Sequence, residues 1–298
     1  MKVAITGASG FLGTALVAHL RGGGNQVLRI GRRRSSGSQP DIIWDARTSI
    51  DAAALEGVDA VIHLAGESIS QRWTAGAKRE IRESRVAGTT LIARTLASLA
   101  SRPAVLVSMS ATGIYGDRGD EPLDESSPTG RGFLADIGRA WEAAADPARA
   151  AGIRVVHPRL GVVLHPDGGA LGKMIPIFSL GAGGKIGSGG QWMSWIGRRD
   201  VLAALAFLLV TPSLSGPVNF TAPEPVTNAD FTDALAHALR RPAIVPVPEF
   251  AIRLLYGEMG EKTVIEGQRV IPRKLLDARF PFIAPRLAEA LKGEGVGE

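Results

Sequence analysis

One stretch near the start of the chain decides the fold: Lys2-Val-Ala-Ile-Thr-Gly-Ala-Ser-Gly-Phe-Leu-Gly13. Its apolar run 3–5 is typical of a buried parallel strand. Three glycines follow, and the amphipathic run 14–20 then predicts a helix. This order aims the first backbone N–H groups of the helix at one point, where they have no partner inside the helix and where the helix dipole adds partial positive charge. The stretch therefore predicts a binding site for a diphosphate group.

The three glycines have separate roles in this interpretation. Gly7 permits the sharp exit from the strand, Gly10 lets a phosphate approach the backbone, and Gly13 lets the helix lie close to the sheet. The spacing is G-x-x-G-x-x-G rather than G-x-G-x-x-G, and a glycine triplet alone also fits an ordinary turn. Because a strand comes before it and a helix after it, we favour nucleotide binding. The predicted contacts from this turn are Gly7, Ser9, Gly10, Phe11, Leu12 and Gly13.

The composition limits the class of protein. A chain of 298 residues, 45% of them hydrophobic, can bury a large core as one domain or as two unequal ones. No run approaches the roughly 20 apolar residues that span a bilayer, so we expect no membrane insertion. Met1 leads directly into the first predicted strand, which leaves no room for a signal peptide, and the absence of cysteine excludes disulfides. We therefore expect a cytoplasmic protein.

The charge balance favours an anionic small ligand over nucleic acid. The net charge is +5, but the arginines are scattered apart from Arg32-Arg33-Arg34, and aromatic residues make up only 5% of the chain. This pattern indicates a solvated surface rather than a nucleic-acid groove. The five histidines show no spacing typical of metal ligands, so no metal site is predicted.

Strand and helix patterns alternate through the first 165 residues. Pro147 disfavours helical angles at Asp146, which predicts that a helix ends there. The alternation implies right-handed crossovers and an α/β fold with a doubly wound parallel sheet, whose ligands bind at the carboxyl ends of the strands. After the first strand and helix, further strands are expected at 26–30, 41–44, 59–64, 104–108 and 154–157, and long helices at 77–99 and 133–145.

The pattern changes after Leu164. Residues 165–198 are rich in glycine, above all 181–190, and are expected to form a loop region that covers the ligand as a flap, with a disordered linker as the alternative. Trp192 and Trp195 favour packing in that segment, more as core residues than as a platform for a substrate. We therefore divide the chain into a dinucleotide-binding Rossmann core, 1–164 and 199–217, and a smaller mixed α/β substrate lobe, 165–198 and 218–298.

The end of the second predicted strand favours NADP(H) over NAD. An NAD site usually places an acidic residue there, about 20 residues after the glycine turn, to bind the ribose 2′-hydroxyl. This chain has Ile30-Gly31-Arg32-Arg33 instead. A carboxylate would repel a 2′-phosphate, whereas Gly31 leaves space and Arg32, more than Arg33, offers a guanidinium to bind it. The alternative is that these arginines form a solvated strand end.

Three further segments each follow or end a predicted strand: Leu64-Ala65-Gly66, Ser108-Met-Ser-Ala-Thr-Gly-Ile-Tyr-Gly116 and Arg159-Leu-Gly-Val-Val-Leu164. Together with the glycine turn they resemble the extended short-chain dehydrogenase/reductases, which include sugar-nucleotide epimerases and dehydratases. The resemblance implies a nicotinamide cofactor contacted by Leu64, Ala65, Gly66 and Arg159. It also implies a small-molecule substrate such as a carbonyl compound or a sugar nucleotide. Many extended relatives pair two long helices with a symmetry mate, which leaves a homodimer open here.

A closer resemblance covers nearly the whole chain. It is carried by His63-Leu-Ala-Gly-Glu67, Arg72-Trp-Thr74, Ser84-Arg-Val86, Gln191-Trp-Met-Ser-Trp195, Ala222-Pro-Glu-Pro225 and Gly257-Glu-Met259. These segments are similar to the epimerase family protein branch, also called the cell-division-inhibitor-like nucleoside-diphosphate-sugar epimerases. Members of that branch carry a C-terminal domain of unknown function similar to residues 245–291 here. This resemblance implies the fold and the cofactor rather than the reaction.

The wider superfamily transfers protons with Tyr-x-x-x-Lys, and this chain lacks that pair. Its two tyrosines are each followed four residues later by glycine: Tyr115 by Gly119, and Tyr256 by Gly260. Aligning Glu142 with a glutamate common on the helix that should carry the pair places Leu134 and Gly138 at the tyrosine and lysine positions. An unperturbed tyrosine, with a pKa of about 10, is almost fully protonated at pH 7, so base chemistry needs a nearby cation.

Three residues remain as catalytic candidates. Ser110 aligns with the family's catalytic serine and can hydrogen-bond a substrate oxygen, although it also fits a turn that closes the strand. Tyr115, supported by Arg139 or Arg159, is a substitute proton donor or, in the alternative we favour, a buried anchor of the turn. Glu67 is an acid or base in the predicted cleft, or else a capping or ion-pairing residue.

Two functions follow from these observations. The first is an NADP(H)-dependent oxidoreductase or epimerase-like enzyme with a replaced proton donor. A reductase tolerates the loss better than a dehydrogenase, because protonating an alkoxide needs only a donor or water whereas deprotonating an alcohol needs a base. The second is a non-catalytic NADP(H)-binding sensor or regulatory protein, which the missing Tyr-x-x-x-Lys favours.

Overall fold

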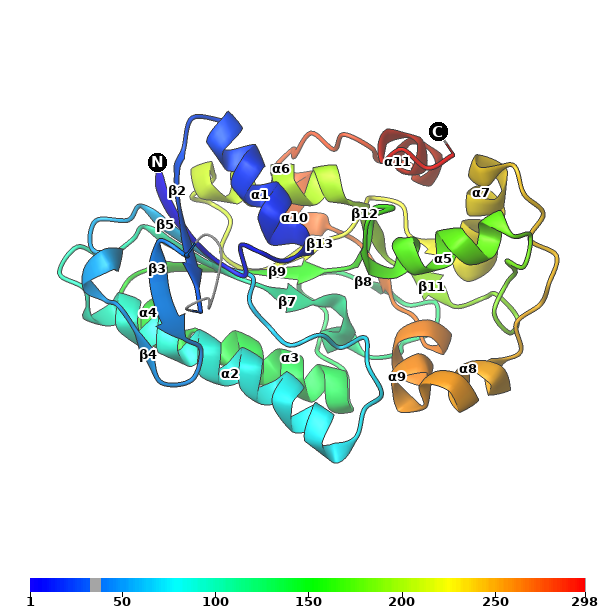
Figure 1. Ribbon diagram of the computed structural model, residues 1–298, viewed down its shortest axis with the longest axis horizontal. Coiled ribbons are helices and arrows are strands. Elements are labelled where there is room, and N and C mark those ends of the chain that lie inside the picture. The colour runs from blue at the N-terminus through cyan, green and yellow to red at the C-terminus, as the bar shows by residue number, and fades with distance from the viewer. Residues whose placement is uncertain (33–38, 298) are drawn as a thin grey trace.

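A largely parallel sheet forms the centre of the molecule (Figure 1). The computed structural model describes residues 1–32 and 39–297, and in that part of the chain the strands follow the order β13-β9-β6-β5-β1-β2-β3-β4, with β7 beside β9. Neighbouring strands are parallel except β3 and β4. The chain order reverses between β1 and β5, so the predicted doubly wound sheet is confirmed. The strands are β1 Lys2–Thr6, β2 Gln26–Gly31, β3 Ile42–Asp45, β4 Ser49–Ile50, β5 Ala60–His63, β6 Val105–Ser108, β7 Ser110–Ala111, β9 Arg154–Leu160 and β13 Gly216–Phe220.

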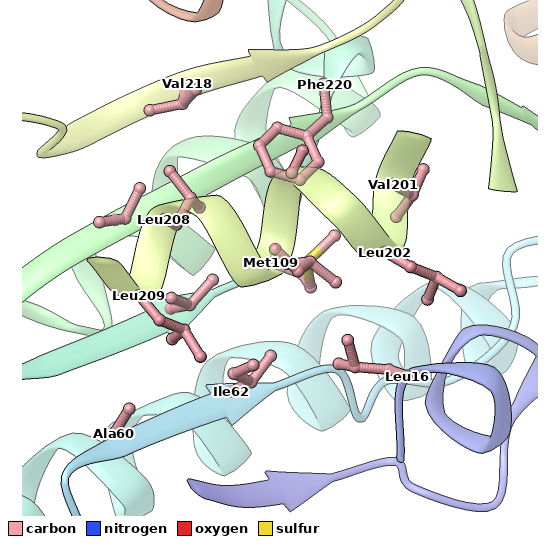
Figure 2. Packing of buried hydrophobic residues seen from close by; sticks show 14 of the residues in the cluster. Leu16, Ala60, Ile62, Met109, Val201, Leu202, Leu208, Leu209, Val218 and Phe220 are labelled. Atoms are coloured by element: carbon pink, nitrogen blue, oxygen red, sulfur yellow. The ribbon is translucent and has the colours of Figure 1, made fainter. Parts of the chain in front are cut away.

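Helices cover both faces of the sheet, because side chains point alternately to the two faces along a strand and those of the central strands are buried on both. Val3 and Ile5 of β1 belong to an apolar cluster with α1 and α6, whereas Ala4 belongs to a second cluster with α2 and α4. Figure 2 shows the first cluster, in which Leu202 of α6 and Ile62 of β5 lie among the labelled side chains. The helices are α1 Phe11–Gly22 and α6 Arg198–Val210 on one face, and α2 Ala75–Ser98, α3 Phe133–Ala143 and α4 Asp146–Ala150 on the other (Figure 1).

The prediction for the end of the 133–145 helix is wrong in one detail. Helix α3 ends at Ala143, but Asp146 does not leave helical geometry, because α4 begins there with Pro147 in its first turn. Proline fits the first turn of a helix since the N–H that it lacks would have no partner in that position. The same proline therefore starts a helix rather than only ending one.

A second apolar core lies in the carboxyl-terminal part of the chain. Leu171 and Phe178 of α5 pack there with Phe231 of α7 and Leu287 of α11. The glycine-rich segment 165–198 is therefore not loop throughout, since its apolar residues drive formation of α5 and two short strands. The remaining elements are α5 Gly169–Ser179, α7 Asn228–Leu239, α8 Glu249–Tyr256, α9 Glu258–Gly260, α10 Arg273–Asp277, α11 Leu287–Gly293, β8 Pro122–Leu123, β10 Val162–Leu164, β11 Trp192–Met193, β12 Trp195–Gly197, β14 Val226–Thr227 and β15 Arg269–Val270, with short helical turns η1 Ala53–Leu55, η2 Thr112–Tyr115 and η3 Glu261–Ile265.

The two tryptophans of this segment differ in their surroundings. Trp195 is fully buried and donates from Nε1 to the carbonyl oxygen of Glu224 at 3.0 Å, which confirms its predicted core role. Trp192 is half-buried, donates to Oδ1 of Asp120 at 2.7 Å and lies 4.5 Å beneath the guanidinium of Arg269. No helix among the described residues is long and apolar enough to cross a bilayer.

Candidate active site

The glycine turn joins β1 to α1 with no room for side chains. Gly7 has a φ of +67°, and a Cβ there would lie 2.9 Å from the backbone nitrogen of Ala65. A Cβ on Gly13 would lie 2.0 Å from the carbonyl oxygen of Gly7. The absence of side chains therefore lets the turn pass close to the segment after β5 and lets α1 pack close against the turn.

The first turn of α1 presents free backbone donors. Within the described residues no acceptor bonds the N–H groups of Phe11 and Leu12, and Gly10 before the helix offers no capping side chain. Ser9 and Gly10 are exposed. A Cβ on Gly168 would lie 2.7 Å from the ring of Phe11, so the glycine segment after β10 closes on this turn. A glycine cradle with unpaired amide donors at a helix N-terminus fits the pyrophosphate of a dinucleotide.

The end of β2 carries a cation instead of an acid. Arg32 directly follows β2 and is exposed, while Arg33 lies outside the described residues. Packing against Pro40 also explains the glycine at position 31, because a Cβ there would lie 3.3 Å from Cβ of Pro40.

The exit of β5 lies beside the exit of β1, where the sheet order reverses. Thr6 Oγ1 accepts the backbone N–H groups of Leu64 and Ala65 at 3.1 and 3.2 Å. Gly66 follows and is exposed at the surface. The three residues predicted to contact the nicotinamide side of a cofactor thus lie next to the glycine turn.

Ser110 belongs to a buried ionic network. Its hydroxyl donates to Oε1 of Glu142 on α3 at 2.8 Å, and Arg159 of β9 donates to both carboxylate oxygens, from Nε at 2.8 Å and from Nη2 at 2.9 Å. Burial acts to raise the pKa of Glu142, but the hydrogen bonds and charge of Arg159 outweigh it and lower that pKa. Burial likewise acts to lower the pKa of Arg159, and the bonds to Glu142 outweigh it and raise that pKa. Both groups therefore stay charged at neutral pH.

Tyr115 lies at the other end of this network. It is fully buried, donates to Oδ1 of Asn219 at 2.7 Å and accepts from Nη1 of Arg159 at 2.9 Å. Burial raises its pKa despite the nearby arginine. These contacts favour the anchoring interpretation of Tyr115, and they leave the guanidinium of Arg159 bonded to Glu142 and Tyr115.

The helix positions aligned with tyrosine and lysine face the turn η2. Leu134 packs against Gly113, and a Cβ on Gly138 would lie 2.8 Å from Cγ1 of Ile114. Position 138 has no room for any side chain, so the close packing of α3 on η2 takes the place that a lysine would need.

Glu67 is exposed after β5. Its carboxylate accepts from Nε2 of Gln71 at 3.4 Å, and its backbone N–H donates to Oγ of Ser84 at 3.0 Å. It is thus reachable from solvent, unlike Ser110 and Tyr115, which are 2% and 0% exposed.

The sequence pattern of the NAD dependent epimerase/dehydratase family matches residues 3–220, from β1 to the end of β13. The chain belongs to this family. It is of the extended short-chain dehydrogenase/reductase type, in which the coenzyme is NAD(P). A domain of unknown function, DUF1731, matches residues 247–293.

Relatives within the epimerase/dehydratase family cover nearly the whole chain. The epimerase family protein Mb2239 of Mycobacterium bovis is 44% identical over 97% of this chain and 96% of its own. The crystal structure of human epimerase family protein SDR39U1 with NADPH has a TM-score of 0.89 at 34% identity, covering 100% of this chain and 99% of that one. The nucleoside-diphosphate sugar epimerase of Corynebacterium glutamicum has a TM-score of 0.83 at 35% identity, covering 100% of this chain and 59% of that one.

Sequence analysis did not predict two polar residues of the network around Arg159 as site residues. Glu142 served only to align the helix, and the local sequence carries no signal of its bonds to Ser110 and Arg159. Asn219 interrupts the apolar strand β13 between Val218 and Phe220, and a buried amide in such a strand signals a specific contact.

Proposed function

We propose that the protein is an NADP(H)-dependent oxidoreductase or epimerase-like enzyme that acts on a small carbonyl compound or a sugar nucleotide. The observation that carries the proposal is the hydroxyl of Ser110, held by Glu142 at the carboxyl end of the sheet, where ligands of doubly wound folds bind. The family is NAD(P)-dependent, and the human relative is described with NADPH.

The choice of NADP(H) over NAD rests on Arg32. Its guanidinium is exposed at the end of β2, where an NAD site usually has an acidic side chain. A planar cation there suits a 2′-phosphate and gives a ribose hydroxyl no charged acceptor. The glycine cradle with its free amide donors supports binding of the pyrophosphate.

When bound, the reduced nicotinamide supplies a hydride to a carbonyl carbon of the substrate. In this proposal Ser110 binds the substrate oxygen after its hydroxyl proton turns from Glu142 toward that oxygen, because the hydroxyl has a single proton and Glu142 accepts it in the structure. The burial of Tyr115 and its bond to Asn219 support Glu67 or water as the proton source instead. Protonation of an alkoxide by water needs no strong acid, which favours the reductive direction.

The test is NADPH consumption, followed by absorbance, with a panel of carbonyl compounds, sugar nucleotides and quinones. We expect turnover that disappears in Ser110→Ala. The control is Ser108→Ala, which removes a buried hydroxyl that has no hydrogen-bond partner among the described residues. Turnover that survives in Ser110→Ala would remove Ser110 from the mechanism.

A non-catalytic NADP(H) sensor is the second candidate, and one observation favours it. The hydroxyl protons of both Ser110 and Tyr115 are already donated within the protein, to Glu142 and to Asn219. Tight NADPH binding without turnover across the whole panel would support this function over the enzyme.

A further inference from the structure

Arg85 is a half-buried cation on α2, and among the described residues it has no carboxylate within salt-bridge distance. Its Nη1 donates to the carbonyl oxygens of Glu67 at 2.8 Å and Ile81 at 3.1 Å. Its guanidinium carbon lies 4.9 Å from the centre of the Trp141 ring. In the part of the chain that the structure describes, no carboxylate oxygen lies within salt-bridge distance of this guanidinium, and Nε and Nη2 make no hydrogen bond.

This environment differs from that of Arg159, which has both oxygens of Glu142. Burial lowers the pKa of Arg85 to about 10, against the opposing effect of the Glu67 charge, so the guanidinium still carries its proton at neutral pH. The Glu67 carboxylate itself accepts from Gln71. The donors Nε and Nη2 of Arg85 have no hydrogen-bond partner among the described residues, so they are available to a ligand of opposite charge.

Arg85 lies directly beneath Gly66. A Cβ at position 66 would lie 3.5 Å from the guanidinium carbon, so a side chain there would cover the cation. Ser84 next to Arg85 accepts the N–H of Glu67 and ties this part of α2 to the segment after β5. The glycine therefore leaves Arg85 reachable from the carboxyl end of the sheet.

We propose that Arg85 binds an anionic group, a carboxylate or a phosphate, of a molecule that lies over Gly66. The inference rests on the proposed function, because it places that molecule where coenzyme and substrate would meet. Nε and Nη2 form one edge of the planar guanidinium, and that edge matches two oxygens of a carboxylate or phosphate. The group belongs either to the coenzyme or to a second molecule, the substrate.

Inorganic phosphate is the probe, and the readout is the melting temperature of the full chain during titration at constant ionic strength with chloride. We expect a saturable rise in the wild type that Arg85→Gln removes and Arg82→Gln keeps. Arg82 is the matched control because it is an exposed arginine of the same helix. An equal response in Arg85→Gln, an equal loss in both variants, or no saturable response in the wild type would each overturn the proposal.

A second series, with saturating NADPH, identifies the source of the anion. If phosphate still raises the melting temperature through Arg85 when NADPH is bound, the site belongs to a second molecule. If NADPH abolishes that rise, the site belongs to the coenzyme. If Arg85→Gln does not fold, Arg85→Lys takes its place, because lysine keeps the charge but lacks the paired donors of the planar guanidinium. We then expect phosphate affinity to fall at least fivefold, and unchanged affinity contradicts the proposal. The assay needs no turnover, so its failure is separate from failure of the proposed function.

Discussion

The hydroxyl oxygen of Thr6 lies 2.7 Å from Nδ1 of His63, between the ends of β1 and β5. The same oxygen accepts the N–H groups of Leu64 and Ala65, so its own proton is donated to Nδ1. The hydrogen-bond network therefore assigns the ring proton of His63 to Nε2. One buried hydroxyl fixes the start of the segment that faces the glycine turn.

Replacing Thr6 by valine keeps the shape and removes this hydroxyl. Buried His63 and half-buried Leu64 and Ala65 then each lose a bond, and we expect the free energy of unfolding to fall by about 1–3 kcal/mol. NADPH affinity should fall as well, because the segment after β5 is no longer held against the turn. Urea unfolding and titration calorimetry measure the two effects, and Thr6→Ser should restore both. A stable Thr6→Val protein with unchanged NADPH affinity would show that the hydroxyl does not position the site.

His63 makes stability depend on pH. Burial lowers its pKa from 6.5 to about 4 in the folded protein. The unfolded chain therefore takes up a proton near pH 6.5 while the folded chain does not. The contribution of neutral His63 to the free energy of unfolding is thus fully present above pH 6.5 and is lost as the pH falls toward 4. The full loss is about 3 kcal/mol, the equivalent of the shift in pKa.

The variant His63→Asn separates this effect from that of other groups. Asparagine keeps an acceptor for Thr6 and cannot be protonated, so the loss of stability between pH 7 and 4.5 should be smaller than in the wild type. His157 is also buried with a lowered pKa and contributes equally to both proteins, so only the difference between the curves matters. His19→Asn, at an exposed position of α1, should leave the curve unchanged. Parallel curves for wild type and His63→Asn would refute the assignment.

Arg32→Ala tests the choice of coenzyme. Losing charged hydrogen bonds to a 2′-phosphate should weaken NADPH binding by about 1–3 kcal/mol and leave NADH binding nearly unchanged. The control is Arg94→Ala, an exposed arginine on α2 that should affect neither coenzyme. Calorimetric titration of both coenzymes decides the matter, and equal losses for NADPH and NADH would contradict a 2′-phosphate contact.

Local sequence was enough to predict the sheet and the glycine turn. Strands such as β1 and β5 are short apolar runs, and the three glycines stand at a strand-to-helix junction, so periodicity and turn chemistry agree there. Helix α5 was missed because its glycine and proline content indicates a loop, while the burial of Leu171 and Phe178 that stabilises it depends on distant partners. The local sequence pattern does not show how segments distant in sequence pack against each other.

The side-chain network was harder to predict for the same reason. Glu142 meets Arg159 across 17 positions, and Tyr115 meets Asn219 across 104. Sequence analysis identified Ser110, Tyr115 and Arg159 and named Arg139 or Arg159 as the partner of Tyr115, and the structure shows the bond from Arg159. It did not predict that Glu142 joins Ser110 to Arg159. The roles of Thr6 and Arg85 depend on their contacts with the segment after β5, which is distant from each of them in sequence.

Gly138 carries the last prediction, because it occupies the position of the missing lysine. A Cβ there would lie 2.8 to 3.1 Å from three carbons of Ile114. Overpacking of this kind costs about 1–3 kcal/mol, so Gly138→Ala should lower stability although alanine favours helices. Gly76→Ala, at an open position of α2, should instead raise stability by roughly 0.5–1 kcal/mol. Denaturant unfolding compares the two, and a stabilised Gly138→Ala would mean that α3 can move away from η2, leaving room for a lysine after all.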